Sequence, residues 1–306
     1  MTIRHLKIFI TVAECGSMNM AAKKLYLSQP TISQAIRELE EYYDTILFDR
    51  LSRRLHITLA GQEFLSQAYQ VVGQFDELER SMQGNRQKNT LRIGATITVG
   101  SCLIPNIMSD FEKTMPDVET YTFIGNTRTI EEKLLKSELD IALVEGEIHH
   151  PDLKTIPSIR DFLVLGCAKD HPFASREELP IRELQHQRFA IREAGSGTRA
   201  LFDRFIKKHN LEIRAAWEAT CPEIFCNAIL YDQCLAVTSV RLLERDIRNG
   251  AVRIFRAPAD ELERSFSLVY HKDKVFTSSM KTIQDIISHY QQPDWLNHVP
   301  VGTLKE

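Results

Sequence analysis

The 306-residue chain lacks the features that mark membrane, secreted and strongly basic proteins. It has no apolar run long enough to cross a bilayer and no secretory signal, so we expect a cytoplasmic protein with no membrane partner. A net charge of only −3 excludes a uniformly basic nucleic-acid coat. The hydrophobic content of 43% and the charged content of 26% are ordinary for globular domains, and the length suffices for two or three of them.

Cysteine is scarce and forms no recognisable pattern. The chain has Cys15, Cys102, Cys167, Cys221, Cys226 and Cys234. None belongs to a Cys-x-x-Cys pair and no histidine stands at zinc spacing, so we expect neither a metal nor a cofactor. Free, mostly buried thiols are the usual state in a cytoplasmic protein. The clustering of the last three in sequence leaves a thiol-based redox sensor as an alternative.

Groups suited to catalysis are also few. Possible acid–base or metal groups are Glu145, Glu147, His149, His150 and His171. His149 and His150 directly precede Pro151, which is typical of a surface loop, and no nucleophile accompanies them. We therefore expect the protein not to be an enzyme.

The strongest pattern lies near the N-terminus, where three short helices are predicted. The first covers residues 3–14 and ends at Gly16, and Ser17 is a good N-cap for the second. Small Ala21 and Ala22 allow another helix to pack closely. Ser28 caps the third helix, which has Pro30 in its first turn, where a missing amide costs little.

The third helix has an apolar face and a polar face. Ile32, Ile36 and Leu39 point inward, while the polar face carries Gln29, Thr31, Ser33, Gln34 and Arg37. Glutamine can pair with adenine through two hydrogen bonds, and Ser or Thr can bond either type of base. A solvated amphipathic helix is the plainer interpretation. The short turn, the cap and the arginine-bearing hairpin that follows favour a helix placed in the major groove of DNA.

The chain resembles the LysR-type transcriptional regulators. The resemblance rests on Leu6, Phe9, Ala13–Glu14, Gly16–Ser17, Ala21–Ala22, Leu25, Ser28–Gln29–Pro30, Ser33, Ile36, Leu39–Glu40, Leu47–Phe48, Arg50 and Leu59–Ala60–Gly61. It implies a winged helix-turn-helix with base contacts from Gln29, Pro30, Ser33 and Gln34. At position 34 many relatives carry Arg or Lys instead of Gln. It also implies wing contacts to DNA from Arg50 and from Arg53 or Arg54. We add Ser28, Thr31 and Arg37 as DNA-binding candidates.

The segment 58–87 contains no proline and predicts a long helix. Its apolar positions Leu65, Ala68, Val72, Phe75 and Met82 form a heptad-like seam interrupted by Glu79. Such a helix either lies on its own domain or pairs with a second copy, and its length favours a dimer. Relatives often form dimers of dimers, so a tetramer is the alternative to a dimer. Residues 84–89 are polar and predict a hinge.

From residue 91 onward, strand and helix patterns alternate, which predicts a parallel α/β sheet. The pattern continues through a second unit and returns to the first near residue 265, so we expect two lobes and a cleft. The resemblance implies the periplasmic-binding-protein-like effector domain of LysR regulators. The expected domains are 1–60 (winged helix-turn-helix), 61–88 (linker helix) and 89–306 (effector domain). Lobe 1 would cover about 89–161 and 268–306, and lobe 2 about 162–267.

Hydroxyl and glycine residues cluster where strands end and helices begin. The candidate effector-binding residues are Thr96, Thr98, Ser101, Thr127, Arg192, Ser196, Gly197 and Thr198. Open α/β sheets bind ligands at the carboxyl ends of their strands, and helix N-termini favour anions. Each hydroxyl alone could be an ordinary cap, but the clusters together predict a site for a small anionic effector.

The leading hypothesis is therefore a sequence-specific, DNA-binding transcription regulator whose promoter contacts respond to that effector. A two-lobed solute-binding protein would share the cleft, but it would not need the N-terminal helices. The predicted partners are double-stranded promoter DNA, a small anion and further copies of the chain.

Overall fold

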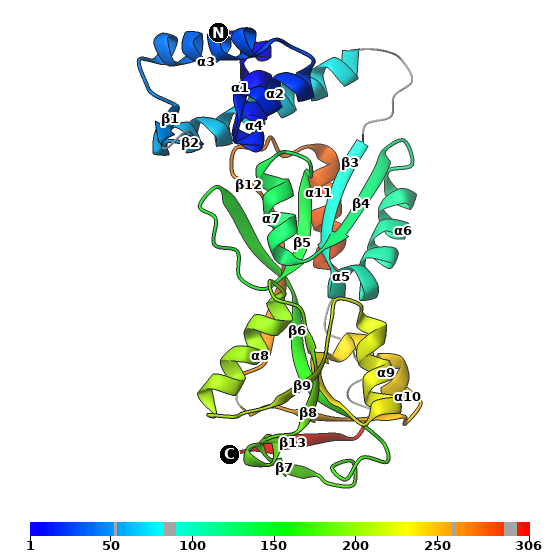
Figure 1. The fold of residues 1–306 in the computed structure, drawn as a ribbon. Coiled ribbons are helices and arrows are strands. Elements are labelled where there is room, and N and C mark those ends of the chain that lie inside the picture. The colour runs from blue at the N-terminus through cyan, green and yellow to red at the C-terminus, as the bar shows by residue number, and fades with distance from the viewer. Residues whose placement is uncertain (52–53, 83–89, 259–260, 291–298) are drawn as a thin grey trace. The chain divides into compact units, whose positions relative to one another are not determined.

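The computed structural model describes residues 1–51, 54–82, 90–258, 261–290 and 299–306 (Figure 1). The chain divides into two compact units. Unit 1 comprises Met1–Gln87 with Leu135–Glu138, and unit 2 comprises Lys88–Leu134 with Leu139–Glu306.

Unit 1 begins with the three predicted helices, which are confirmed. They are α1 (Ile3–Cys15), α2 (Met18–Leu25) and α3 (Gln29–Tyr43). The hydroxyls of Ser17 and Ser28 accept hydrogen bonds from the amides of Met20 and Thr31, as expected of N-caps. Gly16 ends α1 in the left-handed conformation at φ 59°, which glycine adopts without steric cost.

The wing is a hairpin of β1 (Phe48–Leu51) and β2 (Arg54–Ile57), paired antiparallel with Phe48 opposite Ile57. A side chain at Gly61 would collide with the carbonyl oxygen of Leu47, so only glycine lets the next helix start against the wing. Of the predicted wing arginines, Arg53 lies outside the described residues. Arg50 and Arg54 lie in the two strands, but their side chains are outside the described part.

Helix α4 (Leu59–Met82) is the predicted long helix, and it has two apolar sides. Ala68 is buried in the core of unit 1, and Leu65 and Val72 pack against that core. The first half of the predicted dimer seam is therefore turned toward its own domain. A different stripe is exposed, formed by Val71, Leu78 and Met82. The predicted hinge at 84–89 lies outside the described residues.

Unit 2 is a two-lobed α/β structure built on one continuous path of strands, as predicted. The first sheet runs β4–β3–β5–β12–β6, and the second runs β6–β10–β8–β9. The strands of the first sheet are β3 (Thr90–Thr96), β4 (Glu119–Gly125), β5 (Ile141–Glu145), β6 (Leu153–Ala168) and β12 (Glu263–His271). The core strands β3, β4 and β5 are parallel, whereas β12 is antiparallel to both β5 and β6. The predicted parallel sheet is therefore correct for the core strands but not throughout, because the strands that connect the lobes, β6 and β12, pair antiparallel with their neighbours.

The second sheet adds β8 (Arg188–Arg192), β9 (Arg214–Ala219), β10 (Leu235–Ser239), β11 (Val252–Arg256), β7 (Glu178–Pro180) and β13 (Val301–Lys305). Strand β6 belongs to both sheets, because its first half pairs with β12 and its second half pairs with β10 and β11. Strands β6 and β12 therefore connect the lobes, and Figure 1 shows β6 running from one lobe into the other.

Helices cover both sheets. They are α5 (Ile97–Cys102), α6 (Ile104–Thr114), α7 (Thr127–Leu135) and α11 (Ser278–Ser288) in the first lobe, and α8 (Gly197–Lys208), α9 (Pro222–Asp232) and α10 (Glu244–Arg248) in the second. The short 3₁₀ helices η1 (Ile181–Leu184) and η2 (Val240–Leu243) complete the second lobe. None of the helices in the described ranges combines the length and hydrophobicity that crossing a bilayer requires.

Two expectations need correction. The apolar spacing of residues 101–113 predicts a single helix there, but α5 begins at Ile97 and gives way at Leu103 to α6, which has Pro105 in its first turn. The chain's last strand was expected in lobe 1. Instead β13 pairs with β11 and β7 in the second sheet, through long-range contacts that no local sequence pattern reports.

Candidate functional site

The candidate DNA-reading surface is the outward face of α3. Its buried side consists of Ile32, Ala35, Ile36 and Leu39. Gln29, Pro30, Thr31, Gln34 and Arg37 are exposed, and Ser33 is partly exposed. Exposed polar side chains on a short helix that is fixed from behind by a core are what major-groove reading requires.

Hydrogen bonds within this surface connect its middle residues. The amide nitrogen of Gln34 donates to Glu38 at 2.9 Å, and Arg37 donates to the amide oxygen of Gln34 at 3.3 Å. The hydrogen bond from Gln34, followed by that with His5, lowers the pKa of Glu38. A negative charge therefore sits beside two predicted base-reading residues.

Two further residues shape this end of unit 1. The carboxylate of Glu40 accepts from the amides of Leu47 and Phe48 at 2.8 and 3.1 Å, so it fixes the loop that leads into the wing. Tyr26 lies in the turn before α3 with φ 54° and is 96% exposed. No sequence pattern assigned Tyr26 to this surface.

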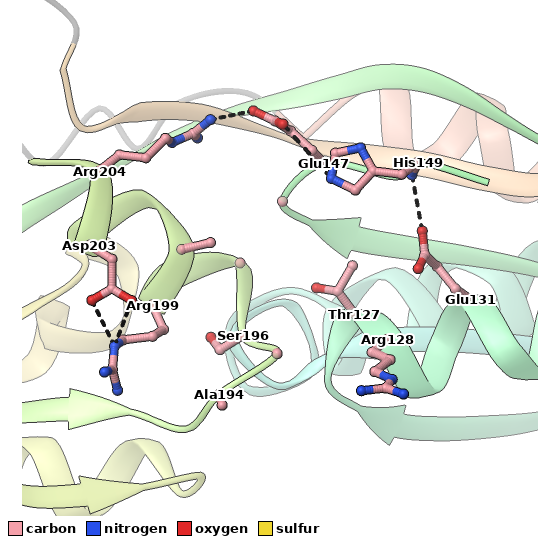
Figure 2. A pocket seen from close by; sticks show the side chains of 14 residues that line it. Thr127, Arg128, Glu131, Glu147, His149, Ala194, Ser196, Arg199, Asp203 and Arg204 are labelled. Atoms are coloured by element: carbon pink, nitrogen blue, oxygen red, sulfur yellow. Dashed lines mark hydrogen bonds and ion pairs between the residues drawn. The ribbon is translucent and has the colours of Figure 1, made fainter. Parts of the chain in front are cut away.

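The candidate effector site lies in unit 2, where strands of both lobes end. Thr96 ends β3, Glu145 ends β5 and Arg192 ends β8. Helices α7 and α8 begin at Thr127 and Gly197, and Figure 2 shows Thr127 and Ser196 on opposite sides of a pocket. The structure therefore brings most of the predicted effector residues together at one edge.

Glu145 stands at the centre of this edge and is only 1% exposed. Its amide donates to the hydroxyl of Thr96 at 3.1 Å, and its carbonyl accepts from the hydroxyl of Thr127 at 2.8 Å. Its side chain accepts from Thr198 at 3.4 Å. Three predicted effector hydroxyls thus converge on one residue, which the sequence had suggested only as an acid–base candidate.

A buried group of charges surrounds Glu145. Arg264, on β12, approaches Oε2 of Glu145 at 3.1 Å and donates from Nε to Asp161 at 2.8 Å. Arg192 approaches Oε1 of Glu145 at 3.8 Å and is held by Glu193 through its Nε and Nη2 atoms at 2.9 and 3.1 Å.

Burial and pairing act in opposite directions on these groups. Burial by itself would lower the pKa of Arg264, but the carboxylates of Glu145 and Asp161 raise it, so the guanidinium stays charged. Burial raises the pKa of Asp161, and Arg264 opposes that change. Because Asp161 and Arg264 lie on β6 and β12, this charge group spans the strands that connect the lobes.

The two lobes touch at a pair of glycines. A side-chain carbon built on Gly197 would lie 2.8 Å from Cα of Gly146 and 2.9 Å from the carbonyl oxygen of Glu145. Gly146 itself has φ 91°, which favours glycine. The backbones therefore meet without intervening side chains, directly beside the buried carboxylate.

Two pockets flank this contact. One, of about 470 Å³, is lined by Thr127, Gly146, Ser196, Gly197 and several charged side chains (Figure 2). The other, of about 380 Å³, is lined by Gly146, Gly197 and Arg264 among others. Most of the charges in the first pocket are paired, since Arg204 binds Glu147 and Arg199 binds Asp203. Arg204 accordingly lowers the pKa of Glu147.

The predicted effector residues fall into four groups. Thr96, Thr127, Thr198 and Arg192 contact Glu145. Thr98 and Ser196 are buried, and within the described residues their hydroxyls have no hydrogen-bond partner. Ser101 is the exception, because its hydroxyl donates to the carbonyl of Ile97 at 2.9 Å and it lines a separate cavity of about 900 Å³. Gly197 forms the contact with Gly146.

Two of the three clustered cysteines, Cys226 and Cys234, have environments that disfavour reactivity. Burial raises the pKa of Cys226 to about 12 and that of Cys234 to about 11. Thiolate is the reactive form, so both thiols are poor nucleophiles near neutral pH. Cys221 donates to Glu223 at 2.9 Å. All six cysteines are free.

The histidines that could suggest catalysis have structural surroundings. Nδ1 of His171 accepts from the amide of Phe173 at 3.1 Å, and burial lowers the pKa of His171. His149 is largely exposed. No group of His, Cys, Asp and Glu suited to holding a metal ion is found within the described ranges.

Two family models match most of the described chain. Residues 3–62 match the model of the bacterial regulatory helix-turn-helix protein, lysR family, and residues 84–291 match the LysR substrate binding domain. The chain is 28% identical to the HTH-type transcriptional regulator CysL of Bacillus subtilis, over 87% of this chain and 89% of that protein. It is 25% identical to the transcriptional activator CmpR of Synechocystis, over 94% of each.

Solved structures show the same fold. A full-length OxyR variant from Pseudomonas aeruginosa gives a TM-score of 0.66 at 20% identity, covering 94% of this chain and 95% of that one. The regulatory domain of Synechocystis CcmR, solved in complex with 2-PG, gives 0.60 at 24% identity and covers 65% of this chain and 96% of that one. The chain belongs to the LysR family of DNA-binding transcription regulators, whose members self-associate and respond to small-molecule effectors.

Proposed function

We propose that a small anion, bound where the two lobes of unit 2 meet, controls how this regulator contacts its promoter. The main support is the set of buried donors at the strand ends. Thr98 and Ser196 present hydroxyls that have no partner within the described residues. The N-termini of α7 and α8, whose free amides favour negative charge, open toward the pocket that Ser196 lines (Figure 2). The CcmR complex with 2-PG is a parallel case in a relative.

The glycine contact suggests how binding changes the domain. Gly146 and Gly197 close over Glu145, so a ligand that reaches the buried groups has to separate or reorganise the lobes. The strands β6 and β12 are the structural link along which such a movement occurs. A ligand shifts this equilibrium only by the difference in its affinity for the two arrangements.

Calorimetric titration of the full chain with a panel of small oxyanions and carboxylates tests the site. We expect Thr98→Ala and Ser196→Ala to weaken binding about tenfold each, because each removes a hydrogen bond to a charged ligand. Ser101→Ala is the matched control, since its hydroxyl is satisfied by Ile97. If no anion binds, or if all three variants bind alike, the proposed site is wrong.

We propose that Ser28, Gln29, Pro30, Thr31, Ser33, Gln34 and Arg37 form the DNA-reading surface, with Arg50, Arg53 and Arg54 on the wing. Tyr26 is added because it is exposed next to the start of α3. Fluorescence anisotropy with promoter fragments should show that Gln29→Ala and Ser33→Ala reduce sequence preference. Retention of full sequence preference by both variants would remove α3 from the reading role.

We propose domain limits of 1–60, 61–88 and 89–306, with the exposed stripe on α4 as a self-association surface. We also propose that the protein acts in the cytoplasm, where its DNA target lies, and that it is not an enzyme. The raised pKa values of Cys226 and Cys234 argue against a thiol switch.

A further inference from the structure

Among the side-chain atoms of Glu145, Arg192 and Arg264, three buried ones lack hydrogen-bond partners within the described residues. They are Oε2 of Glu145, Nη1 of Arg192 and Nη2 of Arg264. Nη2 of Arg264 lies 3.1 Å from Oε2 of Glu145 and forms an ion pair with it, but no hydrogen bond joins the two atoms. The ion pairs thus leave one acceptor and two donors unused in the same place, and buried polar groups are rarely left so.

The charges at this place are already balanced. The arginines are Arg192, Arg241 and Arg264, and the carboxylates are Glu145, Asp161 and Glu193. An anion that enters without a proton presents only lone pairs to Glu145, and like charges repel strongly in a buried environment. An anion that carries a hydroxyl can instead donate to Oε2 while its other oxygens accept from the arginines and from Ser196, the neighbour of Gly197.

We propose that Glu145 makes this site select anions that carry their own hydrogen-bond donor, such as a protonated oxyanion or a 2-hydroxy acid, over anions that have only acceptors. This inference rests on the proposed effector site and names its ligand class. Glu145 is here a specificity-determining residue. A buried polar group that is left unpaired by the wrong ligand discriminates strongly between otherwise similar molecules.

Hydrogen phosphate and sulfate are the first probes. At mildly alkaline pH they have the same charge and nearly the same shape, but only hydrogen phosphate carries a proton. Calorimetry on the full chain should show phosphate binding about tenfold or more tighter than sulfate. Glycolate and acetate form a second pair with the same contrast and one negative charge each.

Glu145→Gln is the decisive variant. It removes the negative charge and adds an amide that can donate, so sulfate binding should strengthen and the phosphate-to-sulfate ratio should fall to about threefold or less. Glu193→Gln is the matched control. It removes a charge from the same group, but Glu193 already accepts two hydrogen bonds from Arg192, so both affinities should change together and the ratio should stay.

Glu145→Asp guards against misfolding of the glutamine variant. The shorter aspartate keeps the negative charge but moves the carboxylate away from the ligand. Phosphate affinity should therefore decrease, while sulfate should still bind weakly. Equal affinities for both members of each pair in the unmodified chain overturn the inference, as does an unchanged ratio in Glu145→Gln. If anions bind and Ser196→Ala lowers their affinity, but no anion pair shows a preference for the donor-bearing member, the effector site is supported and the role of Glu145 is wrong. If none of the probes binds, both are wrong.

Discussion

Gly197 illustrates how a single residue controls the approach of two lobes. The atoms that a side-chain carbon would meet there are backbone atoms of Glu145 and Gly146, which cannot rotate away. The sequence showed Gly197 as part of a hydroxyl-rich cluster and therefore as a ligand-binding candidate. Its partner Gly146 lies 51 positions earlier, so no local pattern could have revealed the contact.

We predict that Gly197→Ala destabilises the contact between the lobes by about 1–3 kcal/mol, the usual cost of overpacking. Thermal unfolding should register the loss, and anion affinity measured by calorimetry should change with it. Lys207→Ala, an exposed substitution on the same helix, should leave both unchanged. Unaltered stability and binding in Gly197→Ala would mean that the lobes do not meet there in solution.

His271 makes stability depend on pH. It ends β12, it is 2% exposed and its Nδ1 accepts from the amide of Asp273 at 3.2 Å. Burial lowers the pKa of His271 below its ordinary value, and the nearby carboxylates of Asp273 and Asp152 only partly oppose this, while Lys272 and His150 add to it. The unfolded chain therefore binds this proton more readily than the folded chain does.

We predict that the free energy of unfolding has its full value above about pH 6.5, the ordinary pKa of a histidine in the unfolded chain. It should decrease as the pH drops below that value, because the unfolded chain then gains a proton at His271. In His271→Asn this part of the pH dependence should disappear, whatever the cost of the substitution at pH 8. Chemical denaturation at several pH values measures it, with the exposed His149→Asn as control. An identical slope in His271→Asn and the unmodified chain would contradict the assignment.

At the scale of elements, sequence patterns predicted what is local. Caps and periodicity located the starts of α1, α2 and α3 and the end of α1 to within a residue or two, because N-caps and apolar spacing are local features. The break between α5 and α6 was missed because the hydrophobic pattern continues through Leu103. Strands β7, β11 and β13 were missed because they are short and are defined by distant partners.

The candidate sites divide in the same way. The hydroxyls at strand ends were visible in the sequence, because strand, turn and cap are neighbours in the chain. The charges were not, since Arg264 meets Asp161 across 103 positions. Arg192 was identified only through its neighbouring glycines, and Glu145 was not recognised as a binding residue at all.

On α3 we predict that Glu38→Gln strengthens DNA binding. The substitution removes a negative charge from the reading face and leaves Gln34 with a neutral, weaker acceptor. Affinity should rise about two- to fivefold at low salt and less at high salt, because surface charges are screened. Anisotropy titrations at several salt concentrations measure this. Glu63→Gln, exposed on α4, is the control, and an affinity unchanged by Glu38→Gln would place the DNA elsewhere.

At the scale of the whole molecule, α4 presents an apolar stripe to its surroundings. Val71, Leu78 and Met82 are 43%, 56% and 77% exposed, and the first two are one heptad apart. This spacing differs from the predicted seam because Leu65, Ala68 and Val72 are used by the core of unit 1. One side of the helix thus packs against the core of unit 1. The other side presents the apolar stripe that a second copy of the chain would contact.

We predict that Val71→Glu combined with Leu78→Glu converts the protein to a monomer, because buried carboxylates in a seam are costly. Light scattering after size-exclusion chromatography gives the mass directly. DNA affinity should fall as well, because two half-sites are bound by the two DNA-binding domains of a dimer. Gln74→Glu, exposed on the same helix, should remain associated, and an associated double variant would assign the interface to another surface.

The position of β13 has a practical consequence for dissecting this regulator. Because Val301–Lys305 lies between β11 and β7, a shortened chain that stops at residue 291, where the domain match stops, loses an inserted strand and uncovers two sheet edges. Such a fragment is expected to aggregate when expressed, whereas one that keeps the last residues should remain dispersed. Strand β13 thus stabilises the second lobe. A tag joined directly after it would crowd the sheet, so a spacer is required.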